Sequence, residues 1–392
     1  MRSQFIIFLT VILSIFTLIH TYIFISSWRL IRYTPVIKWV FLGIFLLCAF
    51  SYPLARTAEN FFKNNVHTTV IIIGSFWIAF MIYYVCAYMA IDIIRLLDRI
   101  FKFLPSYTPD KLAQIKLYLF YGITVFIAII VLLGHIHSRN LKLRKVEIQV
   151  AKSVPGMAEL NIVLVSDIHL GYVIKGGHLK KIVETINKAA PDIVLITGDF
   201  VDEDACNIRD DNISNTLLDI KTKYGIYAIT GNHEFFSGKL DELVKNLEDV
   251  NIIMLRDQIK LINGSFYLIG REDITANRFR GYKRKPLHKL LESANKDLPL
   301  ILMDHQPNKL EEAEKNGVDL QVSGHTHGGQ LFPANLITSL VFEKDHGYYK
   351  KGNTQYYISS GAGTWGPPVR IGSSSEVVHI KMKFKEDSPQ RR

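Results

Sequence analysis

Four long hydrophobic runs precede residue 140, and they restrict what this chain can fold into more than any other feature. The runs are roughly 5–26, 36–54, 68–94 and 115–136. Each is close to the ~20 residues that a helix needs to cross the hydrocarbon core of a bilayer, and charged residues are rare in their centres. We therefore expect four transmembrane helices within residues 1–140. A signal peptide at the first run, or a buried core built from all four, fits their length and flanks less well.

Basic residues concentrate in the same part of the chain. Residues 1–145 contain 15 Lys and Arg against 4 Asp and Glu, and the remainder contains 31 against 32. Basic residues beside membrane segments face anionic headgroups, whereas nucleic-acid binding needs a basic patch on the soluble part. We therefore expect an integral, multi-pass protein of the cell membrane with no nucleic-acid partner. Seven basic residues on one side of the spans and eight on the other leave the side of the soluble part undetermined.

The chain changes character at about Val146. Short apolar runs at 162–165, 193–197, 226–230, 266–269, 300–303, 320–323 and 356–359 are typical of buried strands. Amphipathic helical patterns lie between several of them, at 178–190, 239–247 and 308–316. This alternation predicts an α/β domain with much parallel sheet, which we expect over residues 146–386. The three cysteines, Cys48, Cys86 and Cys206, lack the spacing of a disulfide framework or a thiolate metal site.

Side chains that can bind metals follow five of these expected strands. In chain order they are Asp167 and His169, Asp199 and Asp202, Asn232 and His233, His305, and His325 and His327. Ligands of open α/β sheets bind outside the carboxyl ends of the strands, so parallel strands would bring these clusters to one rim.

These residue types suit one kind of chemistry. Carboxylate, imidazole and amide groups bind borderline divalent metals without any thiolate. The spacings Asp-x-His and His-x-His place two ligands on the same side of an extended segment, because side chains alternate there. A carboxylate that bridges two metals about 3.5–4 Å apart is typical of sites for in-line phosphoryl displacement. A glycine precedes Asp199, Asn232 and His325, where it permits a tight turn and close backbone approach.

Five blocks in a fixed order resemble the calcineurin-like metallophosphoesterase superfamily. The blocks are Asp167-x-His169, Gly198-Asp199-x-x-Asp202, Gly231-Asn232-His233-Glu234, a lone His305, and Gly324-His325-x-His327. The match covers about 161–383. Gly328-Gly329-Gln330 and the loop that ends at Arg370 resemble the branch of membrane-tethered bacterial phosphohydrolases, which includes lipid-nucleotide pyrophosphatases. The resemblance implies a calcineurin-like four-layer β-sandwich of the α/β class flanked by helices, preceded in this chain by a transmembrane four-helix region.

The resemblance also implies a role for each position. The implied ligands are Asp167, His169 and His327 for one divalent metal, Asn232, His305 and His325 for a second, and Asp199 as the bridge. A bridging water with a lowered pKa would be the nucleophile. His233 would protonate the leaving oxygen as general acid, and Asp202 would orient His233. Mn²⁺ is the expected metal, with Fe, Zn or Co as alternatives.

The expected function is hydrolysis of a phosphodiester or pyrophosphate, and the four adjoining spans suggest a lipid-linked substrate. Arg370 could bind that substrate, because a guanidinium matches phosphate geometry; an exposed, uninvolved loop arginine is the alternative. A phosphomonoesterase, or a membrane sensor or scaffold with a phosphoesterase-like domain, are the alternative functions. A sensor would be expected to have lost ligands, yet every ligand position is filled.

Overall fold

The computed structural model describes residues 2–31, 35–58, 64–202, 208, 210–236 and 238–385. Cys206 and residue 386, the expected end of the domain, lie outside the described residues. The chain divides into two compact units, Met1–His135 and Ile136–Arg392.

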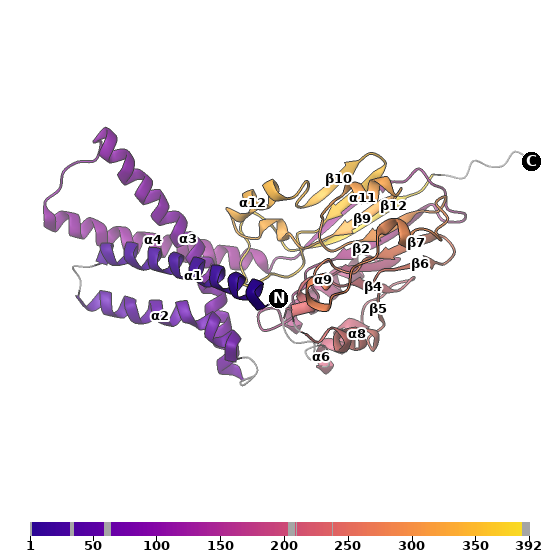
Figure 1. The fold of residues 1–392 in the computed structure, drawn as a ribbon, viewed down its shortest axis with the longest axis horizontal. Helices are drawn as coiled ribbons and strands as arrows, with labels where there is room; N and C mark the ends of the chain where they lie inside the picture. The colour runs from indigo at the N-terminus through magenta and orange to yellow at the C-terminus, as the bar shows by residue number, and fades with distance from the viewer. Residues whose placement is uncertain are drawn as a thin grey trace, which may run out of the picture. The chain divides into compact units, whose positions relative to one another are not determined.

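The first unit is helical throughout its described secondary structure (Figure 1). Its helices are α1 (Arg2–Ile31), α2 (Pro35–Ala58), α3 (Asn65–Phe101) and α4 (Pro109–Ser138), the last of which continues into the second unit. All four are long and apolar enough to cross a membrane, as the hydrophobic runs predict. Polar contacts join α1 to α3: the Trp77 indole donates to His20 Nε2 at 3.0 Å, and Ser27 Oγ lies 2.7 Å from the Tyr88 hydroxyl. Such contacts satisfy polar groups that lipid cannot.

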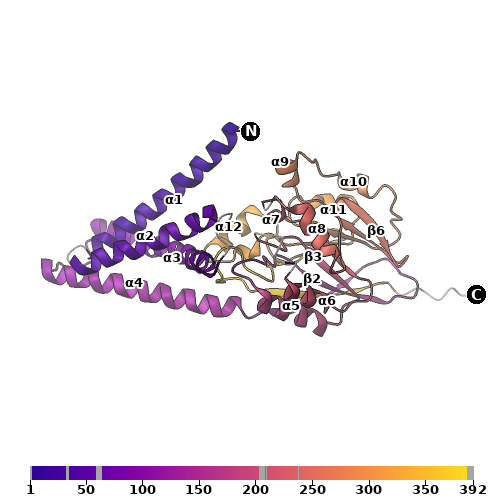
Figure 2. The ribbon, with the colours of Figure 1, turned by 90° about the horizontal axis from the view of Figure 1, so that it is seen from below.

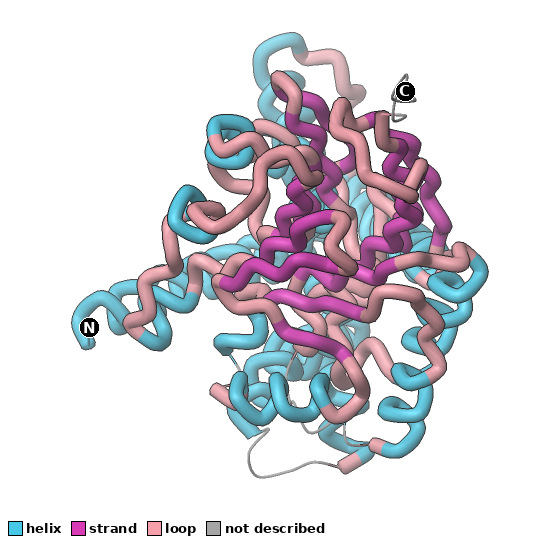
Figure 3. Tube along the Cα trace, turned by 90° about the vertical axis from the view of Figure 1, so that its right-hand side faces the viewer, coloured by secondary structure: helices cyan, strands magenta, loops and turns pink. Residues whose placement is uncertain are grey.

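Strands of the second unit form two six-stranded sheets within its described residues; Figure 3 shows them in magenta at the centre of the unit. The first sheet has the order β1 (Lys142–Gln149), β12 (Glu376–Lys383), β2 (Glu159–Val165), β3 (Ile193–Thr197), β4 (Ile226–Ile229) and β5 (Ile252–Met254). The second has the order β10 (Gly347–Lys351), β11 (Thr354–Ile358), β9 (Leu320–Ser323), β8 (Leu300–Met303), β7 (Phe266–Gly270) and β6 (Gln258–Ile262).

Both sheets are parallel where the expected metal ligands follow the strands. In the first sheet β2, β3, β4 and β5 run parallel, and in the second β7, β8, β9 and β11 do. Antiparallel pairing occurs beside these parallel strands: β12 pairs with β2, β10 with β11, and β6 with β7. All seven expected strands are present, so each sheet presents a rim of parallel carboxyl ends.

The two sheets pack face to face, and helices cover their outer faces, which gives the four layers that the resemblance implies. Side chains alternate along β2: Ile162 and Leu164 lie in the core between the sheets, and Val163 and Val165 lie against the helices. α5 (Gly176–Lys188), α6 (Asp211–Leu218) and α8 (Leu240–Glu248) cover the first sheet (Figure 2). α10 (Leu287–Leu290) and α11 (Glu311–Lys315) cover the second.

Two elements differ from the sequence-based expectation. The helix expected over 308–316 begins only at Glu311, because Lys309 has a left-handed backbone, with φ 54°, that a right-handed helix cannot include. The edge strand β1 was not expected, since its sequence is mostly polar and only partly buried. It nevertheless pairs with β12 along its whole length.

Candidate metal centre

The loops after β2, β3, β4, β8 and β9 bring their polar side chains together at one edge of the sheets. Their His and Asp donor atoms form three overlapping groups, in each of which the atoms lie within 4.8 Å of one another. The groups are Asp167, His169 and His327; His169, Asp199 and His233; and Asp199, His305 and His325. Because Asp199 belongs to two groups and His169 to two, the donors form one continuous centre.

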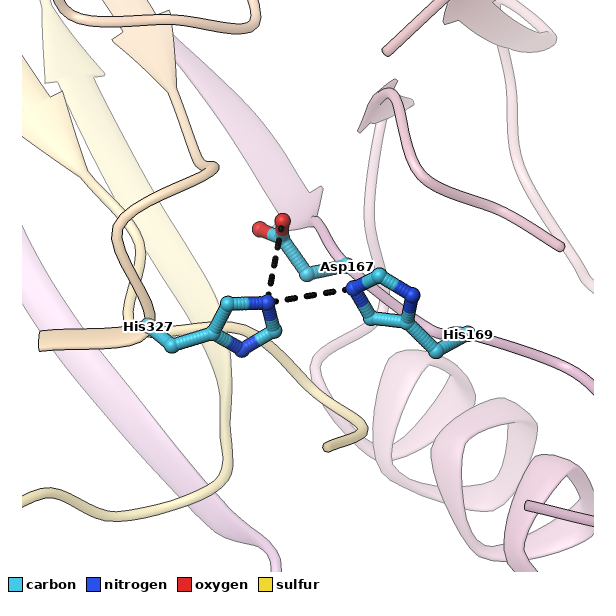
Figure 4. A group of neighbouring side chains, drawn as sticks. All are labelled: Asp167, His169 and His327. Carbon is cyan, nitrogen blue, oxygen red and sulfur yellow. Dashed lines mark hydrogen bonds and ion pairs between the residues drawn. The ribbon is translucent and has the colours of Figure 1, made fainter. Parts of the chain in front are cut away.

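The first group joins the loop after β2 to the loop after β9 (Figure 4). His169 Nε2 and His327 Nε2 are 3.1 Å apart, and His327 Nε2 is 3.6 Å from Asp167 Oδ1. All three side chains are buried. Two imidazole nitrogens and a carboxylate that face one another away from water match the donor set of a divalent metal.

A second set of donor atoms surrounds the side chain of Asn232. Its Oδ1 lies 2.9 Å from His325 Nδ1 and 3.2 Å from His305 Nε2, and His305 Nε2 is 3.3 Å from Asp199 Oδ2. The other ring nitrogen of His305 donates to the backbone carbonyl of Thr197 at 2.7 Å. Such a contact fixes the ring and directs its remaining nitrogen toward a metal.

Asp199 lies between these two sets of donor atoms, the one with His169 and the one with His305. Its Oδ2 is 3.3 Å from His305 Nε2 and 3.7 Å from His169 Nε2, so one oxygen faces donors of both. Its Oδ1 accepts the backbone N–H of His233 at 2.9 Å, which fixes the carboxylate. A bridging ligand between two metals needs this position.

His233 stands beside the centre at the start of α7 (His233–Phe236) and contacts Asp202. Its Nδ1 lies 2.9 Å from Asp202 Oδ1. Burial alone would lower the pKa of His233, but the carboxylates of Asp199 and Asp202 outweigh burial and raise that pKa to about 9. Hydrogen bonds with His169 and His233 likewise overcome burial and hold the pKa of Asp202 well below its usual range. At neutral pH the pair is therefore an imidazolium and a carboxylate.

Three further histidines of the centre, His305, His325 and His327, have shifted pKa values. Burial and the neighbouring His305 lower the pKa of His325 to about 4. Burial and His169 lower the pKa of His327 well below its usual value. Both rings are therefore neutral at physiological pH, which is the form that binds a metal. For His305 the nearby Asp199 outweighs burial and raises the pKa, so metal binding there requires loss of a proton.

Backbone strain is concentrated at these loops. Five non-glycine residues of the centre have a left-handed φ between 50° and 73°, namely Asp167, His169, Asp199, His325 and His327. Strained backbone of this kind persists where the surrounding structure fixes it, and functional sites often contain it. Two glycines are required by close approach: a Cβ on Gly231 would collide with the carboxylate of Asp199, and one on Gly324 with Ser166 and Asp167.

Glu234 has a structural role at the centre that the sequence did not reveal. Its buried carboxylate accepts backbone N–H groups from two loops. The donors are Asp199 at 3.0 Å, Phe200 at 2.7 Å, Val201 at 3.3 Å and Gly231 at 2.6 Å. Glu234 therefore joins the loop of Asp199 to the loop of Asn232. In the sequence, only its position directly after His233 could have indicated this role.

Arg370 is buried within its own loop, so the alternative of an exposed loop arginine is wrong. Its side chain is buried, and its guanidinium donates to the backbone carbonyls of Ser360, Gly363 and His327 at 2.7, 2.7 and 3.2 Å. Arg370 thus holds its own loop against the centre, and its expected role in substrate binding stays a prediction. The Gly- and Pro-rich sequence before it indicated a loop, but not that this loop closes around the guanidinium.

Comparisons with known proteins agree with this geometry. The family model described as calcineurin-like phosphoesterase matches residues 160–329, which include every candidate ligand. An uncharacterized metallophosphoesterase of Helicobacter pylori is 34% identical over 232 residues, which are 59% of this chain and 61% of the relative. The chain thus spans about three fifths of that relative's length. An uncharacterized metallophosphoesterase of Campylobacter jejuni is 32% identical and matches 71% of this chain and 73% of its own. A Danio rerio transmembrane protein with metallophosphoesterase domain is 32% identical, over 62% of this chain and 57% of its own.

Proposed function

Because the chain belongs to the calcineurin-like phosphoesterase family, we propose that it is a multi-pass protein of the cell membrane that cleaves a phosphodiester or pyrophosphate bond at two metals. Metal-dependent phosphoester hydrolysis follows from the family. The observation that supports a dinuclear site is the position of Asp199, whose Oδ2 faces histidines of both donor groups.

The donors divide into two sets of suitable chemistry. Asp167, His169 and His327 would hold one metal, and Asn232, His305 and His325 a second, with Asp199 shared between them. Two divalent ions in these sets would lower the pKa of a water molecule and offset negative charge on the phosphoryl oxygens. Mn²⁺ suits such mixed carboxylate, amide and imidazole donors, and Fe, Zn or Co remain alternatives.

His233 is proposed as the general acid. Asp202 engages Nδ1 of His233, so Nε2 is the nitrogen that remains to give its proton to the leaving oxygen. With its pKa raised to about 9, the imidazolium form is available at neutral pH. Asp202 fixes the orientation of the His233 ring and stabilises its charge, and its Oδ1 also lies 3.4 Å from His169 Nδ1.

Aromatic side chains next to His233 favour a substrate whose leaving group has an apolar or aromatic part. The rings of Phe236 and Trp365 lie 5.2 and 6.0 Å from the His233 ring, and Phe279 of α9 (Ala276–Arg280) lies 5.3 Å from Phe236. All three are half exposed, so they are available for contact. A lipid-linked substrate meets this requirement and also fits a chain with four candidate spans.

One experiment tests the reaction. The full chain, purified in detergent and loaded with Mn²⁺, is assayed with a phosphodiester, a phosphomonoester and a nucleotide-lipid pyrophosphate. Asp199→Asn is expected to lose activity on each substrate that the wild type cleaves, while the exposed Asp297→Asn retains it. If Asp199→Asn matches the wild type, the proposed catalytic centre is wrong. Cleavage of the monoester alone would instead favour a phosphomonoesterase.

A further inference from the structure

One helix of the second unit has an apolar surface that the fold does not bury. α12 (Ala334–Val341) lies beyond the strand ends rather than over either sheet (Figure 1). None of its eight residues, all of which are described, is buried. The exposed fractions are 52% for Leu336, 62% for Ile337, 87% for Leu340 and 69% for Val341. Contiguous apolar surface of this kind on a folded domain marks an interaction site.

The exposed helix is held in place at both ends. Before it, the N–H of Phe332 donates to the carbonyl of Ile371 at 2.8 Å. Near its end, Thr338 Oγ1 donates to Asp345 Oδ2 at 3.0 Å, and the N–H of Phe342 donates to the Thr338 carbonyl. An isolated helix of eight residues is unstable in water, so these contacts fix the exposed surface in one orientation.

The loop that holds α12 also holds the last turn of α4. His137 Nε2 lies 3.1 Å from the Ser373 carbonyl, and Ser138 Oγ donates to the Pro368 carbonyl at 3.0 Å. These residues belong to the same compact unit as α12. The candidate span of α4 ends at Ser138, and the basic residues Arg139 and Lys142 follow it. Basic residues at the end of a span are typical of the headgroup region.

We propose that α12 lies in the interface of the lipid bilayer, with its leucine and isoleucine side chains among the lipid chains. At 1.5 Å per residue its eight residues reach only ~12 Å, which is too short to span and suits an interfacial position. The segment 331–341 contains no charged residue, so its insertion leaves no charge to desolvate. Its polar Thr338 is bonded to Asp345 of its own unit, which leaves the apolar side chains for lipid.

The position of α12 has a consequence for the substrate, and this part rests on the proposed function. Six residues separate His327 from the start of α12, and the Phe342 ring after the helix lies 6.2 Å from the His325 ring. Both ends of the helix are thus connected to proposed metal ligands. A lipid-linked phosphoester could therefore enter the centre with its headgroup while its apolar part stays in the bilayer beside α12.

The docking of α12 is tested without any activity measurement. Single cysteines at Ile337→Cys and Leu340→Cys are introduced into a full chain without native cysteines, spin-labelled, and reconstituted in phosphatidylcholine and phosphatidylglycerol vesicles. Leu261→Cys on β6, an exposed leucine of the sheet, is the control. We expect the labels on α12 to be accessible to oxygen and shielded from a nickel chelate, and the control to show the reverse.

Two outcomes would overturn the inference. Labels on α12 as accessible to the nickel chelate as the control place the helix in water. Immobile labels shielded from both reagents place it against protein, either the chain's own helices or a second copy.

A second measurement tests the link to the substrate. The double variant Ile337→Glu, Leu340→Glu is expected to lower turnover of a bilayer-embedded lipid pyrophosphate at least tenfold. Its turnover of a water-soluble diester should stay within twofold of the wild type. Equal effects on both substrates would refute the link. If the labels on the α12 variants are exposed to lipid while the wild type hydrolyses no substrate, the proposed function is overturned and the docking of α12 stands.

Discussion

Replacing Glu234 by glutamine tests whether this side chain holds the metal centre together. The carboxylate accepts N–H groups from Phe200 and Val201 on one oxygen and from Asp199 and Gly231 on the other. Glutamine has nearly the same shape but only one acceptor oxygen. Two buried N–H groups would then face the amide NH₂, which cannot accept a hydrogen bond.

The expected magnitude follows from those two lost hydrogen bonds. Hydrogen bonds to a charged group contribute about 1.5–3 kcal/mol each, so Glu234→Gln should lower the free energy of unfolding by at least ~3 kcal/mol. With a urea dependence of about 3 kcal/mol per molar, the unfolding midpoint should fall by about 1 M. Pulse proteolysis of the detergent-solubilised full chain across a urea series measures that midpoint.

The matched control is Glu248→Gln, the same substitution at an exposed position of α8. It should change the free energy of unfolding by less than about 0.5 kcal/mol. If Glu234→Gln and Glu248→Gln give the same midpoint, the four hydrogen bonds do not stabilise the centre and the argument is refuted.

Three further predictions concern the metals and their surroundings. Dialysis against EDTA should abolish hydrolysis and Mn²⁺ should restore it; activity that survives with no metal detectable by mass spectrometry would contradict the proposed centre. Asp202→Asn should lower kcat about 100-fold while metal content and KM stay within twofold, because the orientation and charge of His233 change while the asparagine oxygen can still accept from His169 Nδ1. A fall in metal content would instead show that Asp202 supports the ligand His169 or is itself a ligand. Arg370→Met should lower the free energy of unfolding by about 3 kcal/mol or more, through the buried carbonyls left without a donor, in the same urea assay. A higher KM at unchanged stability would instead support the expected substrate-binding role.

The elements that the sequence predicted well are those with a strong local signal. A strand such as Ile193–Thr197 is buried on both sides, so its first four residues are apolar, and a glycine follows directly after it. Parallel strands then bring Asp199 and its counterparts to one rim, which is why the sequence alone predicted the candidate centre. Edge strand β1 gave no such signal, because only one side of it is covered and polar residues fill the other.

Contacts that depend on distant segments were not predictable. The N–H groups that donate to Glu234 belong mostly to residues more than 30 positions earlier, and no local sequence pattern indicates these hydrogen bonds. The carbonyls around Arg370 come together only when its loop folds, so no sequence pattern indicated its burial. The apolar residues of α12 are typical of a buried helix, and only the structure shows that the protein leaves them uncovered.

The position of β12 has a consequence for how the protein is made. This strand, Glu376–Lys383, lies between β1 and β2 in the first sheet, although the ribosome delivers those two strands much earlier. During synthesis the gap between them stays open, with unpaired backbone on both sides, until Glu376–Lys383 emerges. Completion of the sheet is therefore a late, long-range event. Shortening the chain before Glu376 should leave a nascent domain with two unsatisfied strand edges, which makes it a target for aggregation and proteolysis.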